Sequence, residues 1–167
     1  MADARNRPDS KSATDTWLTP RTILDPLGEF DLDPCCPPNM PWRTAKRMVS
    51  LPEDGLAIEW HGRVYVNPPW SDPLPWIRKM HHHKDGIWLS PAKSTDTKWG
   101  QLVLASCDAV FFPAGRPLFH YPDGSPSTGK WTPVMLAAWK QHNIDALYRL
   151  QLVMPGSLFI NTQTPPP

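Results

Sequence analysis

The chain has 167 residues with 17 basic and 16 acidic side chains, so its formal net charge is only +1. This length predicts one domain that can bury a core without disulfides or metal ions. The small net charge excludes a polycationic coat for nucleic acid, although it allows a local basic patch. No apolar run reaches the roughly 20 residues of a membrane-spanning helix, and the polar N-terminus does not resemble a signal peptide. We therefore expect a cytoplasmic protein with no membrane partner.

Proline and tryptophan stand out in the composition. The chain has 22 Pro and 9 Trp, whereas Pro makes up only about 5% of an average chain. This composition favours a compact fold with many fixed turns and flat aromatic surfaces. The three cysteines, Cys35, Cys36 and Cys107, are odd in number and poorly spaced for a zinc site, so we expect reduced thiols and no metal.

The expected elements alternate between strands and helices across one domain, residues 16–160. Residues 1–15 are polar and predict a flexible arm, and residues 161–167 predict a flexible tail. Helices are expected at 20–27, with Thr19 as a hydroxyl cap, and then at 74–82, 97–105 and 143–148. Strands are expected at 30–33, 62–66, 86–90, 108–112, 133–139 and 150–154, with irregular segments at 34–53 and 113–130.

Short strands that are apolar on both faces and alternate with helices are typical of an α/β domain with a mostly parallel sheet. Ligands of such sheets bind beyond the carboxyl ends of the strands. In this chain those ends carry distinctive segments: Asp33-Pro34, Asn67-Pro68-Pro69-Trp70, Ser90-Pro91-Ala92 and Pro113-Ala114-Gly115-Arg116. We therefore expect a ligand site along this edge of the sheet.

The segment Asn67-Pro68-Pro69-Trp70 has the strongest chemical character. Proline removes backbone donors and leaves carbonyl acceptors, so the Asn67 side-chain oxygen and the Pro68 carbonyl can converge as two acceptors. Two acceptors beside a flat ring suit an exocyclic amine, with Trp70 stacked on the face of that ring. A plain turn after a strand is the alternative interpretation, but the preceding strand and the following aromatic sharpen the signal.

These four residues resemble the (Asp/Asn/Ser)-Pro-Pro-(Tyr/Phe/Trp) motif of methyltransferases that modify exocyclic amines of nucleobases. More closely, the chain is similar to the small phage-type DNA N6-adenine methyltransferase family, which is Dam-like and uses S-adenosylmethionine. The resemblance extends from Trp17 to about Trp139. It rests on ordered blocks: Trp17-Leu18-Thr19-Pro20, Phe30-Asp31-Leu32-Asp33-Pro34-Cys35, Glu53-Asp54-Gly55-Leu56 with Trp60, Arg63 to Trp70, Ser90 to Trp99, and Gly115-Arg116-Pro117-Leu118-Phe119.

The resemblance implies a Rossmann-like sheet for S-adenosylmethionine-dependent methyl transfer, in a minimal single domain. It implies catalytic roles for Asn67, Pro68, Pro69 and Trp70. It implies cofactor binding by Trp17, Thr19, Pro20, Asp31, Asp33, Pro34, Asp54, Gly55, Leu56 and Asn67. These roles make chemical sense, because the ammonium group of the cofactor needs a carboxylate and its adenine amine needs an acceptor such as Asp54.

The chain departs from the family pattern next to the expected cofactor site. Cys35-Cys36-Pro37-Pro38 replaces the usual Gly-rich turn, and no clear acidic residue follows a second strand to bind the ribose hydroxyls, for which Asn39 is a weak candidate. The last position of the catalytic motif is Trp70 rather than the commoner Tyr.

The expected substrate is DNA, double- or single-stranded, with the target adenine flipped out of its stack. Candidate substrate contacts are Trp70, Lys93, Arg116 and Phe119, although Phe119 can alternatively cap the core. Methylation of cytosine N4 or of an RNA base stays open, as does a catalytically inactive nucleic-acid-binding or anti-restriction module of the same fold. Both a monomer and a homodimer are compatible with the sequence, and a phage-encoded chain would work in the cytoplasm of its bacterial host.

The run His81-His82-His83 is a further candidate, for metal or phosphate binding. Neighbouring residues of a helix point in different directions, so the three rings cannot face one ion. We expect a solvated helix end that, with Arg78, Lys79 and Lys84, forms a basic patch.

Overall fold

The computed structural model describes residues 16–127 and 132–162 of the chain. The expected N-terminal arm, residues 1–15, lies outside the described residues, as do residues 163–167 of the expected tail and residues 128–131 of the long loop. The described strands are β1 (Leu32–Asp33), β2 (Arg47–Met48), β3 (Val64–Val66), β4 (Gly86–Pro91), β5 (Ala109–Pro113), β6 (Val134–Trp139) and β7 (Gly156–Ile160). The helices are α1 (Arg21–Leu27), α2 (Leu74–His83), α3 (Lys98–Ser106) and α4 (Gln141–Val153), with a short 3-10 turn, η1 (Ala92–Ser94).

The strands form one sheet in the order β2-β1-β3-β4-β6-β5-β7. The pairs β1·β2, β1·β3 and β3·β4 are parallel, whereas β4·β6, β5·β6 and β5·β7 are antiparallel. The sheet is therefore mixed, and the expectation of a mostly parallel sheet is wrong. Residues 133–139 read correctly as a buried strand, but a strand that is apolar on both faces can pair in either direction, so its pattern carried no information about orientation.

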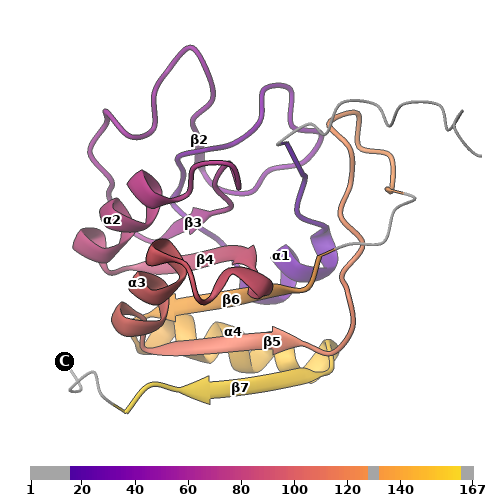
Figure 1. Cartoon of the computed structure of the whole chain (residues 1–167). Coiled ribbons are helices and arrows are strands. Elements are labelled where there is room, and N and C mark those ends of the chain that lie inside the picture. The colour runs from indigo at the N-terminus through magenta and orange to yellow at the C-terminus, as the bar shows by residue number, and fades with distance from the viewer. Residues whose placement is uncertain (1–15, 128–131, 163–167) are drawn as a thin grey trace, which may run out of the picture.

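Helices cover both faces of this sheet (Figure 1). Helices α1 and α4 pack on one face, and α2 and α3 pack on the other. The alternation of side chains along β3 shows how the two cores arise: Tyr65 belongs to the core under α1 and α4, while Val64 and Val66 belong to the core under α2 and α3. Because successive side chains of a strand point to opposite faces, a strand that is apolar throughout must be covered on both sides.

The C-terminal part of the chain differs most from expectation. Residues 150–154 were predicted as a strand, but they form the end of α4 and its cap, and this helix extends well beyond the expected 143–148. Ile144, Leu147 and Leu150 are buried on one helix face, which is the spacing of a helix rather than of a strand. Pro155 follows the helix, and the final strand, β7, begins one residue later at the edge of the sheet.

Gly156 explains how β7 can lie so close to β5. A Cβ atom at this position would come within 2.5 Å of the Phe111 ring and of the Phe112 carbonyl oxygen. A larger residue there would push the edge strand away from its neighbour. The sequence reading also missed β2, which comprises only two residues inside a Pro-rich segment.

Candidate functional site

A pocket of about 240 Å³ opens at the carboxyl ends of β1 and β3. These two strands are neighbours, but the chain leaves β1 toward β2 on one side and leaves β3 toward β4 on the other. Such a reversal of strand order creates a crevice at the strand ends, which is where open α/β sheets bind ligands. The pocket is far larger than a site for one water molecule or ion, and its lining is mainly apolar with a few carboxyl groups.

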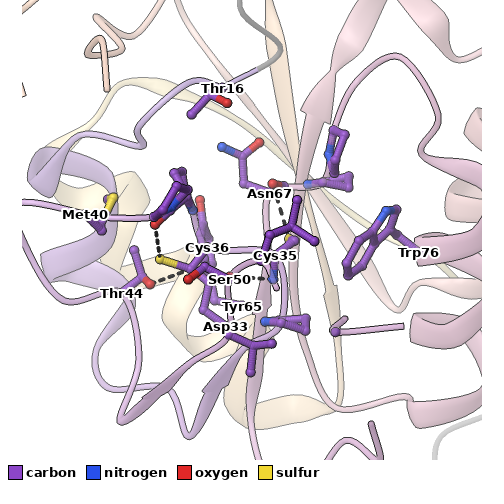
Figure 2. A pocket seen from close by; sticks show the side chains of 18 of the residues that line it. Thr16, Asp33, Cys35, Cys36, Met40, Thr44, Ser50, Tyr65, Asn67 and Trp76 are labelled. Atoms are coloured by element: carbon purple, nitrogen blue, oxygen red, sulfur yellow. Dashed lines mark hydrogen bonds between the residues drawn. The ribbon is translucent and has the colours of Figure 1, made fainter. Parts of the chain in front are cut away.

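Ten of the residues predicted for the site line this pocket. They are Trp17, Thr19, Asp33, Pro34, Asp54, Gly55, Asn67, Pro68, Pro69 and Trp70. They come from four separate segments of the chain: the stretch before α1, the end of β1, the loop after β2 and the end of β3. Figure 2 shows Asp33, Cys35, Tyr65 and Asn67 gathered around the pocket. The segments at the ends of β1 and β3 meet as predicted from the shared carboxyl edge of parallel strands, and the other two segments had been implied only by the family resemblance.

The side-chain amide of Asn67 is held on both sides. Its nitrogen donates to the backbone carbonyl of Trp17 (2.9 Å) and to the Thr19 hydroxyl (3.2 Å). Its oxygen accepts a hydrogen bond from the indole N–H of Trp70 (3.1 Å). A carbonyl oxygen has two lone pairs, so the Asn67 oxygen can accept one further hydrogen from a ligand.

Thr19 does not cap a helix. Pro20 precedes the first residue of α1, and no side chain caps the helix end. The Thr19 hydroxyl is buried and bonds instead to the Tyr65 hydroxyl (2.8 Å) as well as to Asn67. Burial raises the pKa of the Tyr65 phenol, so this group stays protonated. Thr19, which was expected to cap the helix, thus supports the Asn67 side chain instead. The local sequence pattern could not show this contact, because Asn67 is far from Thr19 in the chain.

Trp70 and Phe119 form an edge-to-face pair with ring centroids 6.0 Å apart. Trp70 is half-buried at the pocket, while Phe119 is fully buried in the core. Phe119 therefore exposes no ring face to a base, and the expectation that it contacts the substrate directly is not met; the alternative, a core residue, describes its position. Backbone hydrogen bonds between Leu18 and His120 tie this loop to the segment before α1.

Cys35 and Cys36 also line the pocket. The Cys35 thiol donates to the backbone carbonyl of Asn67 (3.3 Å), and the Cys36 thiol donates to the Pro37 carbonyl (3.1 Å). Burial raises the pKa of Cys36 to about 12 and also raises that of Cys35. Both thiols are protonated near neutral pH, so they are poor nucleophiles and serve as hydrogen-bond donors in the turn that replaces a Gly-rich one.

Asp33 supplies a buried carboxyl group at the end of β1. It accepts hydrogen bonds from the Thr44 hydroxyl (2.5 Å) and from the backbone N–H of Cys35 (3.1 Å). Neither partner carries a charge, and burial raises the pKa of Asp33 to about 6. A buried carboxylate with neutral partners is stabilised by any cation that enters the pocket. Asp33 is thus suited to bind a positively charged ligand group.

The loop after β2 brings further carboxyl groups to the pocket. Gly55 packs directly against Pro34, the residue that follows β1, because a Cβ atom there would come within 1.8 Å of the Pro34 carbonyl oxygen. The Trp60 indole donates to the Gly55 carbonyl (2.8 Å), and Lys79 from α2 donates to the carbonyls of Leu56 (2.6 Å) and Ile58. These contacts hold Asp54 at the pocket wall.

Glu53 is an acidic residue of the pocket wall that was not among the predicted site residues. It lines the pocket beside Asp54 and pairs with Arg47 of β2. A carboxylate in the loop after the second strand can accept hydrogen bonds from two neighbouring hydroxyl groups. The signal was present in the block that begins at Glu53, but the two-residue strand before it could not be recognised. Asn39, the weak candidate for the ribose, is not among the residues that line the pocket.

Three predicted cofactor residues, Pro20, Asp31 and Leu56, do not line the pocket. Asp31 accepts a hydrogen bond from the backbone N–H of Arg63 (2.9 Å) and pairs with Lys46 (3.0 Å). These contacts lower its pKa, and they connect β1 to its neighbouring segments. Of the two acids in this block, only Asp33 lines the pocket, because Asp31 precedes β1 and its carboxylate is held by Arg63 and Lys46 instead.

Lys93 and Arg116 lie outside the pocket lining. Both are exposed, Lys93 in η1 after β4 and Arg116 in the loop after β5. The two segments follow the carboxyl ends of strands that run in the same direction as β3, so both cations lie along the pocket edge of the sheet.

The histidine run forms the last turn of helix α2, and none of the three histidines lines the pocket. The His83 ring bonds to the Gly62 carbonyl (2.8 Å), and the rings of His81 and His82 contact each other. Within the described residues, no group of three or more His, Cys, Asp or Glu side chains is arranged to hold a metal ion. None of the helices in the described ranges has the length and apolar character needed to cross a lipid bilayer.

Comparison with known proteins identifies the family to which this site belongs. No curated protein and no solved structure matches the chain. A family model, described as DNA N-6-adenine-methyltransferase (Dam), matches residues 7–147, which are most of the chain and include every segment that lines the pocket. The chain therefore belongs to the Dam family of DNA N-6-adenine methyltransferases, as the resemblance of its sequence blocks had indicated.

Proposed function

We propose that this chain transfers a methyl group from S-adenosylmethionine to the N6 amine of an adenine in DNA. The main support is the convergence of two kinds of group in one pocket. Asn67 and the Pro68 carbonyl provide acceptors for an amine, and Asp33 provides a buried carboxyl for a cation. Family membership supports both the reaction and the substrate class.

The pocket residues fit S-adenosylmethionine by the chemistry of their side chains. Asp33 would hold the ammonium group of the cofactor, because it is a buried carboxyl whose partners are neutral. Glu53 and Asp54 would accept hydrogen bonds from hydroxyl and amine groups at the other end of the pocket. When bound, the cofactor supplies a methyl group that is already activated by its sulfonium centre.

The protein's role in the reaction is to position and polarise the target amine. The Asn67 side-chain oxygen and the Pro68 carbonyl would accept the two hydrogens of the amine, which directs its lone pair at the methyl group. Trp70 would stack against the base. The amine itself attacks, so no protein nucleophile is needed, and the protonated Cys35 and Cys36 take no covalent part. The proton lost by the amine passes to solvent, because an amide oxygen is too weak a base to keep it.

The strand order supports a Rossmann-like methyltransferase fold. Strands β2, β1, β3 and β4 are parallel and reverse their order between β1 and β3, and the pocket opens at that reversal. The antiparallel strands β6 and β7 extend this parallel half without changing the ligand site.

Recognition of DNA would depend on short loops. The segments 36–52, 70–75, 93–98 and 113–130 carry the exposed cations Lys93 and Arg116, and the described residues of these segments follow strands or flank the pocket. When the target base is flipped into the pocket, these short loops offer few side chains to contact the base pairs on either side of it. We therefore expect a short or relaxed recognition sequence, and mapping of methylated adenines tests this expectation; strict recognition of six or more base pairs would contradict it.

The proposed activity can be tested directly. Purified protein is incubated with labelled S-adenosylmethionine and unmethylated DNA, and the labelled nucleosides are identified after digestion. The expected product is N6-methyladenine. Labelled N4-methylcytosine, or label in RNA but not DNA, would replace the proposed substrate, and cofactor binding without transfer would indicate an inactive binding module. Gln141→Ala, at the start of α4, is a suitable control because this exposed amide lies at the opposite end of the sheet.

A further inference from the structure

The surroundings of the Asn67 side chain contain one group that can only accept a hydrogen bond and one that can only donate. The backbone carbonyl of Trp17 has no hydrogen to give, and it lies 2.9 Å from the Asn67 nitrogen. The indole nitrogen of Trp70 has no lone pair to offer, and it lies 3.1 Å from the Asn67 oxygen.

These two neighbours determine the orientation of the amide. If the amide were rotated by half a turn, its oxygen would face the Trp17 carbonyl and its N–H groups would face the Trp70 N–H. Both contacts would be repulsive. Thr19 does not oppose either orientation, because its hydroxyl can donate or accept. The amide oxygen is therefore presented toward Trp70 before any ligand binds.

We infer that this site accepts an amide at position 67 and rejects a carboxylate at neutral pH. This inference rests on the proposed function, and it concerns a choice that the motif leaves open, since the resembling methyltransferases use either Asp or Asn at this position. A carboxylate would place one oxygen about where the Asn67 nitrogen now lies, against the Trp17 carbonyl. The Thr19 hydroxyl could turn to donate to it, but the backbone carbonyl cannot.

Protonation offers the only simple relief of this contact. A protonated carboxyl has one O–H donor, which could bond to the Trp17 carbonyl as the Asn67 nitrogen does now. The pKa of a carboxyl at this position is therefore expected to lie above its usual range, because only the protonated form satisfies its neighbour. The titratable groups around the position are Cys35, Tyr65 and Asp33, with Glu53 and Asp54 elsewhere on the pocket wall.

The first test compares the thermal stability of Asn67→Asp with that of the wild type between pH 4.5 and pH 8. Taking the difference at each pH removes the contribution of Asp33, which titrates in both proteins. A carboxyl group whose folded-state pKa is raised destabilises the fold increasingly as the pH rises from its unfolded-state pKa to its folded-state pKa, so the melting temperature of the variant should approach the wild type at low pH and fall below it as the pH rises. Asn67→Ala is the matched control, and its difference from the wild type should not depend on pH. The inference would be overturned if the melting temperature of Asn67→Asp equalled that of the wild type at pH 8, or if the difference between the two were the same at every pH.

The second test uses activity. At pH 8 the Asn67→Asp variant should transfer methyl groups at least ~100-fold more slowly than the wild type, because a small displacement of a reacting group has an effect of this size. Its rate relative to the wild type should rise as the pH falls toward 5.5. A variant with wild-type activity at pH 8 contradicts the proposal.

Trp70→Phe keeps a flat ring but removes the indole donor, so it tests the other side of the amide even if Asn67→Asp does not fold. We expect kcat to fall several-fold while KM for DNA and the affinity for S-adenosylmethionine stay unchanged, because stacking is kept and only the orientation of the amide is loosened. An unchanged kcat would show that the Trp70 N–H does not position Asn67. If the wild type shows no methyl transfer at all, the proposed function fails, but the stability series still decides whether an amide is required.

Discussion

The two halves of the sheet differ in what their strands carry. In the half formed by β2, β1 and β3, the strands have only two or three residues and end in polar, Pro-rich loops that line the pocket. In the half formed by β6, β5 and β7, the strands have five or six residues, and β6 is buried along its whole length. The pocket chemistry is thus concentrated where short parallel strands end, while the longer antiparallel strands contribute burial. Substitutions in one half should therefore affect function, and substitutions in the other should affect stability.

The largest effect is expected for Asn67→Ala in the pocket half. The variant loses the acceptor proposed to polarise the target amine, and methyl transfer should fall by about 10²–10³-fold or more, the effect of removing one preorganised polar group from an active site. Its melting curve should stay close to that of the wild type, since Asn67 is only partly buried. Transfer of labelled methyl to DNA measures the effect, and full activity in this variant would contradict the mechanism.

Leu136→Ala in β6 should show the opposite behaviour. Leu136 is fully buried at the centre of the antiparallel half, where it is paired with Leu89 and Phe111 in the neighbouring strands. Loss of its side chain should cost about 2–5 kcal/mol of unfolding free energy, measured by chemical denaturation. The protein that stays folded should bind cofactor with wild-type affinity. A weakened affinity with unchanged stability would break the division between the two halves.

In the pocket half, Asp33→Asn should raise the stability of the fold at pH 7 while weakening the binding of S-adenosylmethionine. The pKa of Asp33 is raised from 3.8 to about 6 by burial, so the ionised carboxylate destabilises the fold by about 3 kcal/mol above pH 6 and not at all below pH 4. The neutral amide removes this cost, and the variant should be more stable than the wild type at pH 7 by an amount that disappears as the pH falls to 4.

The same variant should bind S-adenosylmethionine about 10–100-fold more weakly, because a hydrogen bond to a charged group contributes about 1.5–3 kcal/mol. Calorimetry measures the affinity, and denaturation over pH 4–8 measures the stability. Unchanged cofactor binding would show that Asp33 does not hold the ammonium group.

A smaller effect is expected from Lys79→Met. This side chain donates to the carbonyls of Leu56 and Ile58 and lies over the Trp60 ring, so it supports the loop without lining the pocket. Cofactor affinity should fall about three- to tenfold, since the Asp54 loop loses a charged hydrogen bond, while kcat at saturation stays unchanged. A fall in kcat with unchanged affinity would assign Lys79 a different role.

The smallest effect is expected from Phe159→Thr in β7. Phe159 is 60% exposed on the edge strand at the far side of the sheet from the pocket. Exposed substitutions of this kind usually change stability by less than about 0.5 kcal/mol, and both denaturation and methyl transfer should match the wild type. A large loss of activity would mean that the antiparallel half takes part in the function after all.

Much of the pocket half was predictable from the sequence. The end of a buried strand and the residues that follow it are adjacent in the chain, so the position of Asn67 to Trp70 at a sheet edge could be read from a local pattern. The rule that parallel strands share a carboxyl edge then brought Asp33 and Asn67 together. Glu53 was missed because the strand before it comprises two residues, too few to produce a period.

The antiparallel half was less predictable. The apolar residues of β6 indicated a strand but not its direction. The last residues of α4 were predicted as a strand because this segment is short and strongly apolar. Phe119 could have been a ligand contact or a core residue on the same local evidence, and only its complete burial in the folded core shows which.

The α/β class, the family and the chemical identity of the groups at the strand ends follow from the amino-acid sequence, because these depend on residue type and on short-range spacing. The tertiary structure decided which of Asp31 and Asp33 faces the pocket, why Thr19 supports Asn67 instead of capping a helix, and which way the Asn67 amide points. Each of these depends on a hydrogen bond between segments that are far apart in the chain. Trp17 and Asn67 are 50 residues apart, and nothing in either segment alone indicates that a carbonyl of one will meet the amide of the other.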